Sequence, residues 1–438
     1  MNLDRISLVG LGKLGLCLAA IYADKGIDVL GVDINKNVVD KVNAGESPII
    51  ETGLAELIKK NGGKSLKATL DIDRAITETD ATIILTATPS LPDGGFSNCQ
   101  IEAALTSLAK KLATSDKPYQ LFVISSTVVP GSIENSFIPL IEKLSGRKLN
   151  EGFGICYDPD FVALGNVVKD FQNPDMVIIG ESDHKAGETL EILHSKILEN
   201  SAPVCRMSLA SGEIAKVCLN AFITTKISFA NLIGNICSKF PGANPDNITD
   251  ALGHDKRISP YYFKAGLSYG GTCFPRDTWA LSYVLKSKSL KTTMMDACEE
   301  INKSRDAGLL DAALIAANDA GAKRVGILGL AFKPGTPVIV ESPGIKLVQG
   351  LIDKGLKVVA YDPLALPSAR EVLGDKIDYA ASARECLDSS DVCVLTLPSK
   401  NMAQDIYDYE SSRSVAIIDA WRILNKSLLP TNIEIKYM

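Results

Sequence analysis

The segment 269–277 reads YGGTCFPRD and places Cys273 at the start of a predicted helix. Its two glycines allow a tight turn of the backbone, and its proline suits the first position of a helix. The amides and the partial positive charge of a helix amino terminus favour a thiolate, which is the form that attacks a carbonyl carbon. Asp277 follows by four residues, so it is expected on the same side of the first turn. The alternative is a buried cysteine that only packs, which is the commoner role of a free cysteine.

A glycine-rich turn near the amino terminus predicts a dinucleotide site. Gly10-x-Gly12-x-x-Gly15 follows an apolar strand and opens a helix, and a second strand ends at Asp33, 18 residues beyond Gly15. The glycines admit a pyrophosphate to the helix amino terminus, and the acid accepts hydrogen bonds from ribose hydroxyls. Because a carboxylate repels a 2′-phosphate, NAD is favoured over NADP. A turn that only caps the helix is the alternative. A hydride carrier together with a nucleophilic thiol indicates carbonyl oxidation.

Polar residues also follow two further predicted strands. Thr86 and Thr88 come after the apolar run 82–85, and Thr127 comes shortly after the run 121–124. In a parallel sheet the carboxyl ends of the strands border the ligand crevice, so these hydroxyls are expected there. The alternative is that each only caps the next helix.

Composition narrows the class of protein. The 438 residues predict two to three domains, and 46% hydrophobic residues suffice for packed cores. The net charge of −6 argues against nucleic acid or anionic membrane as a partner. We expect a cytoplasmic protein, because the chain opens without a secretory signal and no uninterrupted apolar run approaches the ~20 residues that span a bilayer. Ten cysteines without CxxC spacing indicate reduced thiols, and three scattered histidines predict no metal site.

The order of the predicted elements indicates an α/β fold. A strand and glycine turn recur at 324–330, and further strands follow at 357–363 and 392–395. We therefore expect two Rossmann-like doubly wound domains joined by a long central helix and a small helical domain. The expected boundaries give an NAD-binding domain over residues 1–205, a central helical and dimerisation domain over 206–305, and a carboxyl-terminal α/β domain over 306–438.

A long helix is predicted from Ser211 to about residue 240. Glu213, Lys216 and Asn220 fall on one face of it, and their largely apolar neighbours argue against a merely solvated charged face. A long helix between two α/β domains is also a natural interface between copies of the chain. We therefore expect a homodimer or a higher homo-oligomer.

Five motifs in order make the whole chain resemble the UDP-glucose and GDP-mannose 6-dehydrogenase family. They are Gly10-x-Gly12-x-x-Gly15, Ser126-Thr127-Val128 with Pro130-Gly131, Glu213-x-x-Lys216-x-x-x-Asn220, the segment from Gly270 to Asp277, and Gly329-Leu330-Ala331-Phe332-Lys333. The resemblance implies that the C6 alcohol of a sugar nucleotide is oxidised twice to a carboxylate, with two NAD molecules used in succession. It also implies that the carboxyl-terminal domain binds the sugar nucleotide.

The resemblance further implies roles for single residues. Cys273 would capture the aldehyde as a thiohemiacetal, whose oxidation yields a thioester that water cleaves. Lys216 and Asp277, with Asn220 and Thr127, would hold the developing alkoxide and an ordered water. Arg257 resembles an arginine that reaches the substrate from a neighbouring subunit. The implied contacts are Gly10, Gly12, Leu14, Gly15, Asp33, Lys36, Thr88 and Thr127 for NAD, and Phe161, Lys216, Asn220, Arg257, Tyr262, Gly270, Phe332 and Lys333 for the substrate.

Four positions depart from the family pattern. Where the family reads Pro-Glu-Phe-Leu-x-Glu-Gly, Asp160 supplies a carboxylate one methylene shorter, a candidate for activating water, and Leu164 supplies none. The family segment Thr-Asp-Asp-x-Arg ends here in Val340, and Arg276 replaces the usual lysine. These changes are compatible with a weaker cofactor site, a different sugar or slow thioester hydrolysis.

The resemblance favours a UDP-hexose, with UDP-glucose first, as the substrate. GDP-mannose or another sugar nucleotide is an alternative, because the segment 259–263 also suits that branch of the family. Leu164 and Val340 leave open a homologue that binds a sugar nucleotide but has lost catalysis. The retention of Cys273, Lys216 and Asp277 argues against it, since binding alone needs no thiolate.

Overall fold

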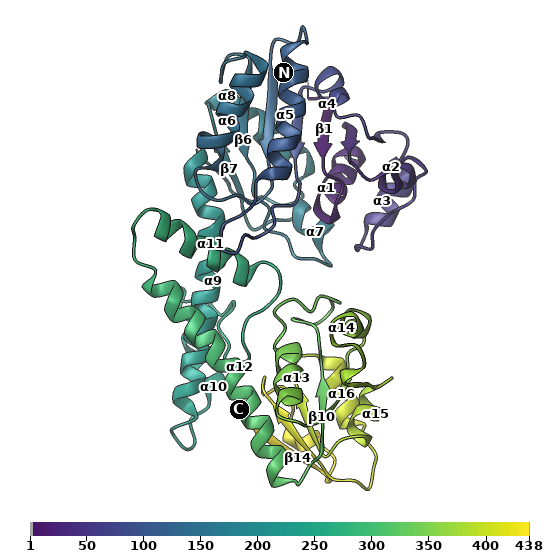
Figure 1. Cartoon of the computed structure of the whole chain (residues 1–438), viewed down its shortest axis with the longest axis vertical. Helices are drawn as coiled ribbons and strands as arrows, with labels where there is room; N and C mark the ends of the chain where they lie inside the picture. Colours follow the sequence, from purple (N-terminus) through teal and green to yellow (C-terminus); the bar gives the residue numbers. More distant parts are fainter. Residues whose placement is uncertain (1–2, 438) are drawn as a thin grey trace. The chain divides into compact units, whose positions relative to one another are not determined.

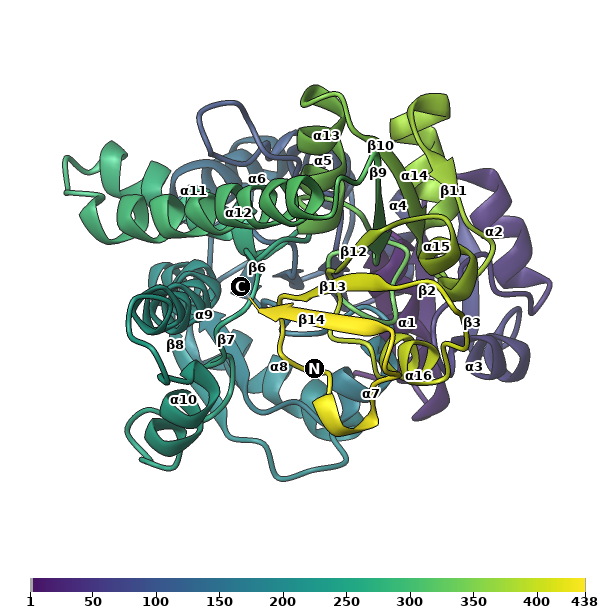
Figure 2. The ribbon, with the colours of Figure 1, turned by 90° about the horizontal axis from the view of Figure 1, so that it is seen from below.

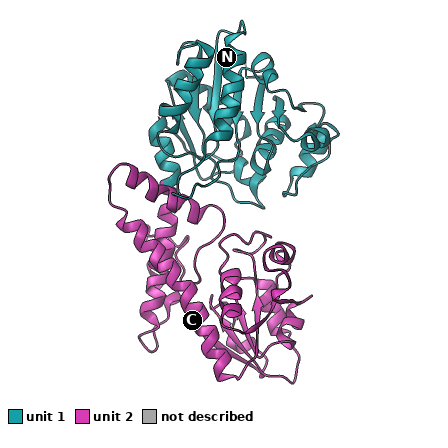
Figure 3. Ribbon diagram, viewed as in Figure 1, with its two compact units in different colours: residues 1–217 teal, residues 218–438 magenta. Residues whose placement is uncertain are grey.

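The computed structural model describes residues 3–437 and divides into two compact units, Met1–Val217 and Cys218–Met438 (Figure 3). Helix α9 (Leu209–Cys237) runs across the division. The three domains expected from the sequence divide the chain into more parts than these two units and stay a prediction. Their second boundary, between residues 305 and 306, falls inside the continuous helix α12 (Thr293–Asp319).

The first unit is built on an eight-stranded sheet with the order β3-β2-β1-β4-β5-β6-β7-β8, parallel except between β6 and β7 (Figure 1). Its strands are β1 (Arg5–Val9), β2 (Asp28–Val32), β3 (Leu66–Thr69), β4 (Ala81–Ile84), β5 (Gln120–Ile124), β6 (Phe153–Tyr157), β7 (Val177–Glu181) and β8 (Val204–Ser208). Its helices are α1 (Lys13–Asp24), α2 (Lys36–Asn43), α3 (Leu54–Asn61), α4 (Asp73–Glu78), α5 (Cys99–Ala113), α6 (Ile138–Ser145), α7 (Val167–Gln172) and α8 (His184–Ile197), with a π-helical turn η1 (Ile133–Phe137) before α6.

Both faces of this sheet are buried under helices. Successive residues of β5 belong to different cores: Leu121 and Val123 pack with α1 and α8, whereas Phe122 and Ile124 pack with α5 and α6. All four side chains are fully buried. A strand in such a position reads as a continuous apolar run, which is why the sequence pattern located it correctly.

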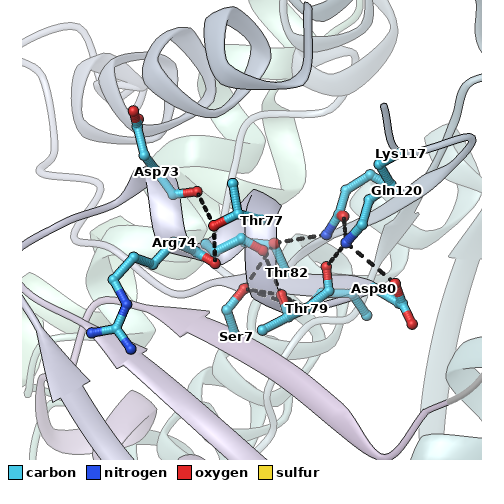
Figure 4. Close-up of polar contacts among 11 residues, drawn as sticks. Ser7, Asp73, Arg74, Thr77, Thr79, Asp80, Thr82, Lys117 and Gln120 are labelled. Atoms are coloured by element: carbon cyan, nitrogen blue, oxygen red, sulfur yellow. Dashed lines mark hydrogen bonds and ion pairs between the residues drawn. The ribbon is translucent and has the colours of Figure 1, made fainter. Parts of the chain in front are cut away.

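A buried polar cluster joins β1, β4 and β5 inside this core (Figure 4). The hydroxyls of Ser7 and Thr82 lie 2.8 Å apart, and the amide of Gln120 donates to Thr82 over 3.0 Å. Lys117 donates to the Gln120 carbonyl at 3.1 Å and pairs with Asp80 at 3.2 Å. Because each member has a partner, the cluster can be buried without unsatisfied polar atoms on these groups.

The second unit contains a parallel six-stranded sheet with the order β11-β10-β9-β12-β13-β14. Its strands are β9 (Arg324–Leu328), β10 (Lys357–Tyr361), β11 (Asp378–Tyr379), β12 (Val392–Leu395), β13 (Val415–Asp419) and β14 (Ile433–Tyr437). Its further helices are α10 (Pro245–Gly253), α11 (Phe274–Ser287), α13 (Pro343–Asp353), α14 (Leu366–Leu373), α15 (Ala383–Asp388) and α16 (Lys400–Tyr407), with 3-10 turns η2 (Gly374–Lys376) and η3 (Lys426–Leu428). Figure 2 shows α12 and α13 on one face of this sheet and α15 and α16 on the other. The two sheets and α9 confirm the predicted α/β class.

Helix α9 is long and apolar enough to cross a membrane, with 29 residues and a mean hydropathy of 1.3 in its most apolar window. Length and composition alone do not distinguish such a helix from a core helix of a soluble protein. Two polar residues on α9 have partners inside the protein. Glu213 is fully buried and accepts backbone hydrogen bonds from Gly131 and from Ile133, the first residue of η1. Asn231 bonds both polar atoms of its side-chain amide to the segment 266–267.

Candidate active site

The glycine-rich turn lies between β1 and α1 in the first unit. Gly10 has φ of 98°, a left-handed conformation that favours glycine. A Cβ at Gly15 would lie 1.9 Å from the carbonyl oxygen of Gly10, so glycine allows α1 to pack closely on the turn. A Cβ at Gly12, the residue before α1, would meet no atom within 4 Å. The space beside Gly12 and the amides at the start of α1 fit a pyrophosphate.

Asp33 follows β2 on the same edge of the sheet and is half-buried. Its Oδ2 accepts from the Leu11 amide and its Oδ1 from the Asn35 amide, each at 2.8 Å. These two bonds fix the carboxylate and leave a lone pair on each oxygen for ribose hydroxyls. Leu14 packs partly buried on the core under this turn, and Lys36 begins α2 as an exposed residue that pairs with Asp40 at 2.6 Å.

Thr88 and Thr127 follow the neighbouring strands β4 and β5, and the structure brings them together. The Thr88 hydroxyl donates to the carbonyl oxygen of Thr127 over 2.7 Å, and Ser126 donates to the Thr86 carbonyl at the same distance. These hydroxyls therefore join the two strand ends, as the position at the edge of a parallel sheet predicts.

Asp160, Phe161 and Lys216 form a second group in the first unit. Lys216 is buried, its ammonium donates to the backbone carbonyl of Asp160, and it lies 4.7 Å from the ring centroid of Phe161. Burial, and to a lesser extent the charge of Asp158, raises the pKa of Asp160 to about 8. A carboxyl group with a pKa near the working pH is suited to exchange protons with water.

Asp158, two residues before Asp160, forms a buried pair with a histidine that no sequence motif indicated. Nε2 of His194 on α8 is 2.9 Å from Oδ1 of Asp158, and both residues are less than 10% exposed. Burial by itself would lower the pKa of His194. The charge and the hydrogen bond of Asp158 act in the opposite direction and prevail, so the pKa of His194 is raised. The pKa of Tyr22, on α1, is raised well above its usual value by burial and by the same two aspartates.

Glu213 has a structural position despite its place in the motif with Lys216. Its carboxylate accepts from the amides of Gly131, at 2.6 Å, and Ile133, at 3.0 Å. Burial raises the pKa of Glu213 to about 7 although both amide bonds oppose the shift. Glu213 thus holds the segment that follows Thr127 against α9.

In the second unit, Cys273 is the residue that caps the amino terminus of α11, as predicted. It is exposed, the backbone amide of Asp277 donates to its carbonyl at 2.9 Å, and the hydroxyl of Thr272 lies 3.5 Å from its sulfur. One turn into α11, the carboxylate of Asp277 accepts a hydrogen bond of 2.6 Å from the Asn220 amide of α9. The buried-cysteine alternative is therefore wrong for Cys273.

The loop before Cys273 packs against the segment that follows β9. A Cβ at Gly270 would lie 2.2 Å from the carbonyl oxygen of Glu341, and one at Gly271 would lie 2.5 Å from the ring of Phe332. The Gly271 amide also donates to the Val340 carbonyl over 2.9 Å. Glycine is needed at both positions because backbone and an aromatic ring occupy the space of a side chain.

A cavity of about 570 Å³ opens beside Lys333 at the carboxyl ends of β9, β10 and β12. Such a position is where ligands bind in open α/β sheets. The ammonium of Lys333 lies 5.7 Å from the ring of Phe332 and can neutralise an anionic group. Further residues line this cavity without belonging to a recognised motif, although their places at or after the ends of strands in the second repeat could have indicated them: Tyr361, Ser399, Lys400, Asn401 and Asp405.

Tyr262 and Arg257 lie in the loop after α10. The ring of Tyr262 meets Phe274 edge-on, with centroids 5.8 Å apart. Arg257 is exposed and forms a paired contact with Asp255, with Nη2 2.6 Å from Oδ2. The side-chain hydrogen bonds of Arg257 go to Asp255 and not to a predicted site residue. To bind the substrate, Arg257 would have to release Asp255.

The departures from the family pattern occupy different surroundings. Leu164 packs partly buried on the core of the first unit, whereas the side chain of Val340 is exposed and its backbone carbonyl supports Gly271. Within residues 3–437 no group of three or more His, Cys, Asp or Glu side chains is placed to hold a metal ion.

Two doubly wound sheets, a glycine turn followed by an acid, and a thiol at the start of a helix are typical of an NAD-dependent dehydrogenase. Comparison with known proteins gives the family. Residues 4–198 match the NAD binding domain of the UDP-glucose/GDP-mannose dehydrogenase family, residues 210–304 its central domain, and residues 326–426 its UDP binding domain. The chain belongs to this family and is a nucleotide-sugar 6-dehydrogenase that uses NAD.

Individual relatives cover almost the whole chain. The UDP-glucose 6-dehydrogenase AglM of Haloferax volcanii is 37% identical over 423 residues, which are 96% of this chain and 97% of the relative. A GDP-mannose 6-dehydrogenase of Pseudomonas savastanoi pv. phaseolicola is 35% identical over 82% of this chain and 80% of its own. The structure of a UDP-glucose dehydrogenase from Pyrobaculum islandicum is similar with a TM-score of 0.87 and 30% identity, over 99% of this chain and 96% of that one.

Proposed function

We propose that the protein is a UDP-glucose 6-dehydrogenase that converts the C6 alcohol to a carboxylate. The observation that carries the proposal is the exposed Cys273 at the start of α11, one turn before an Asp277 carboxylate that Asn220 orients. The similarity to two enzymes that act on UDP-glucose supports the choice of sugar nucleotide.

The reaction would proceed in three stages. NAD, when bound, supplies the two-electron acceptor for each of the two oxidations. Loss of the hydroxyl proton and of a hydride from C6 gives the aldehyde. Lys216 and Asn220, one turn apart on α9, would stabilise the alkoxide that forms on the way. The Cys273 thiolate then adds to C6 while the carbonyl oxygen takes up a proton. The resulting thiohemiacetal gives up this hydroxyl proton and, as a hydride, the remaining hydrogen of C6, and becomes a thioester.

Hydrolysis would complete the reaction. Asp160, as a carboxylate, would take a proton from water while the water oxygen bonds to C6. The C–S bond then breaks, and Cys273 leaves as a thiolate with the acid as product. This role of Asp160 is supported by its raised pKa and by Lys216, which fixes the backbone of Asp160.

We also propose that the protein forms a homodimer through α9. Apolar side chains stay exposed along this helix and just beyond it: Phe222, Phe229, Leu232, Ile236 and Phe240. Their spacing of seven, three, four and four residues places them near one face, and an exposed apolar patch of this kind is typical of an interface. Sedimentation should give a dimer for the wild-type chain and a monomer for Phe222→Glu with Phe240→Glu.

The stoichiometry of NADH formed per sugar nucleotide tests the function. UDP-glucose and GDP-mannose are offered in turn to the wild-type chain, to Cys273→Ser and to Cys99→Ser, which alters the other exposed cysteine. Two NADH per UDP-glucose, lost only in Cys273→Ser, is the expected result. Oxidation of GDP-mannose instead would establish the alternative substrate, which a 35% identical relative favours. Binding without NADH formation would indicate a homologue that has lost catalysis.

A further inference from the structure

Lys226 on α9 points its ammonium at the backbone of the loop after α10. The nitrogen donates to the carbonyl oxygens of Tyr261, at 2.7 Å, and Ile258, at 3.0 Å, and lies 3.4 Å from that of Ser259. An ammonium group has three donors and no acceptor, so it matches three converging carbonyls. Lys226 has no place in the chemistry proposed above.

The loop that Lys226 holds has an unfavourable backbone. Ser259 and Tyr262 adopt φ of 68° and 58°, although neither is glycine. A backbone conformation of this kind is strained for a residue with a side chain and persists only where the surroundings enforce it. At the far end of the loop, the buried Phe263 stacks on Phe229 of α9 with centroids 6.4 Å apart. Lys226 and Phe229 thus fasten the loop to the same helix at two points.

The fastened loop carries two residues that bear on the substrate site. Tyr262 lies edge-on against Phe274, which directly follows Cys273. Arg257, one residue before the first carbonyl that Lys226 binds, is exposed. A shift of this loop would therefore move the aromatic contact beside the nucleophile and the arginine together.

We propose that Lys226 is a positioning residue: by binding the carbonyls of Ile258, Ser259 and Tyr261 it fixes the loop that sets Tyr262 against Phe274 and presents Arg257. The effect on sugar-nucleotide binding rests on the proposed function. The order of the loop itself does not.

Two measurements on the full chain test the order of the loop without any substrate. One is cleavage after Arg257 by an arginine-specific protease, and the other is alkylation of Cys273 by iodoacetamide, followed by mass spectrometry. Lys226→Met removes the donors and keeps a helix-compatible side chain, whereas Lys239→Met alters an exposed lysine just beyond α9. We expect both rates to rise about tenfold in Lys226→Met only, as the loss of charge-assisted bonds to carbonyls predicts. Rates equal to those of Lys239→Met would overturn the proposal.

Lys226→Gln is the second variant and keeps one amide donor, so it decides the question if Lys226→Met does not fold. Its rates should lie between those of the wild-type chain and the methionine variant. With an active enzyme, KM for the sugar nucleotide should rise about tenfold while KM for NAD, held by the other unit, is unchanged. A fall of kcat with both KM values unchanged would contradict a positioning role. Failure of every sugar nucleotide to react would refute the proposed function. The protease and alkylation rates would still test whether Lys226 orders the loop, because they need no substrate.

Discussion

The amide of Asn220 donates a hydrogen bond of 2.6 Å to the carboxylate of Asp277, across 57 positions of sequence. Asn220 lies on α9, the same helix as Lys216, and Asp277 lies one turn into α11, the helix that Cys273 caps. This bond fixes a hydrogen-bond acceptor in the first turn of α11, four residues after Cys273. A preorganised charge of this kind stabilises a transition state without a cost of reorganisation.

Replacing Asp277 with asparagine should lower kcat by about 10² to 10³ with little change in KM, since in the proposed mechanism this charge acts on the reacting centre. Steady-state NADH formation measures this. Asn220→Ala should have a smaller effect in the same direction, because the carboxylate stays and loses one hydrogen bond. An equal rise of KM in both variants, with kcat retained, would show that the pair binds substrate instead of assisting the reaction.

The hydrolysis step should depend on pH through Asp160. Only the carboxylate accepts a proton from water, and the pKa of Asp160 is raised to about 8, so hydrolysis should accelerate as the pH rises toward 8 and then level off. Below that pH the thioester on Cys273 should accumulate, which acid quenching and mass spectrometry detect. In Asp160→Asn the thioester should persist at every pH; rapid release of the acid by this variant would assign the proton transfer to another group.

The same shift predicts how stability depends on pH. The pKa of Asp160 is raised in the folded chain from the usual value of 3.8, so between pH 4 and 8 the folded state binds more protons than the unfolded state. The contribution of Asp160 to stability is therefore fully present below pH 4 and is lost as the pH rises through 8. Comparing urea unfolding of the wild-type chain and Asp160→Asn should show a flatter profile in the variant; identical slopes would contradict the shift.

Asp33 and Asp362 end corresponding strands of the two sheets but differ in their bonds. Asp362 is 2% exposed and accepts from four backbone amides, whereas Asp33 is half-buried and accepts from two. Asp33→Asn should weaken NAD binding about tenfold and narrow the preference over NADP, as titration calorimetry can measure. Asp362→Asn should leave NAD binding unchanged and destabilise the chain by about 1–3 kcal/mol, because it leaves buried amides without acceptors. Weaker NAD binding in both variants would contradict the assignment of Asp33 to NAD binding and of Asp362 to stability.

The cluster around Gln120 should contribute to stability without affecting the site. Gln120→Leu removes the hydrogen bonds that join Gln120 to Thr82 and Lys117, which keep Ser7 and Asp80 as partners, and should cost about 0.5–1.5 kcal/mol in urea unfolding. Gln349→Leu removes an exposed bond to Asp353 and should change the free energy of unfolding by less than about 0.5 kcal/mol. Equal effects of the two substitutions would show that the buried cluster adds nothing beyond a surface contact.

Local features of the site were determined by the sequence itself. The glycine turn before α1, the acid after β2 and the cysteine that caps α11 depend on residues within one strand, turn and helix. The backbone preferences of Gly10 and Pro275 and the burial of both faces of the sheets act over short stretches, so residue type and spacing suffice to predict them.

The contacts between distant segments were decided by tertiary structure alone. Asn220 meets Asp277, Asp158 meets His194, and Lys226 binds the loop at Ile258 only because helices and strands pack in one particular register. Glu213 illustrates the limit, since its motif placed it beside Lys216 but its burial against Gly131 made it a support of the fold. Hydrogen bonds need their donor and acceptor within a few tenths of an ångström, and that precision comes from packing of the whole unit, which no local pattern encodes.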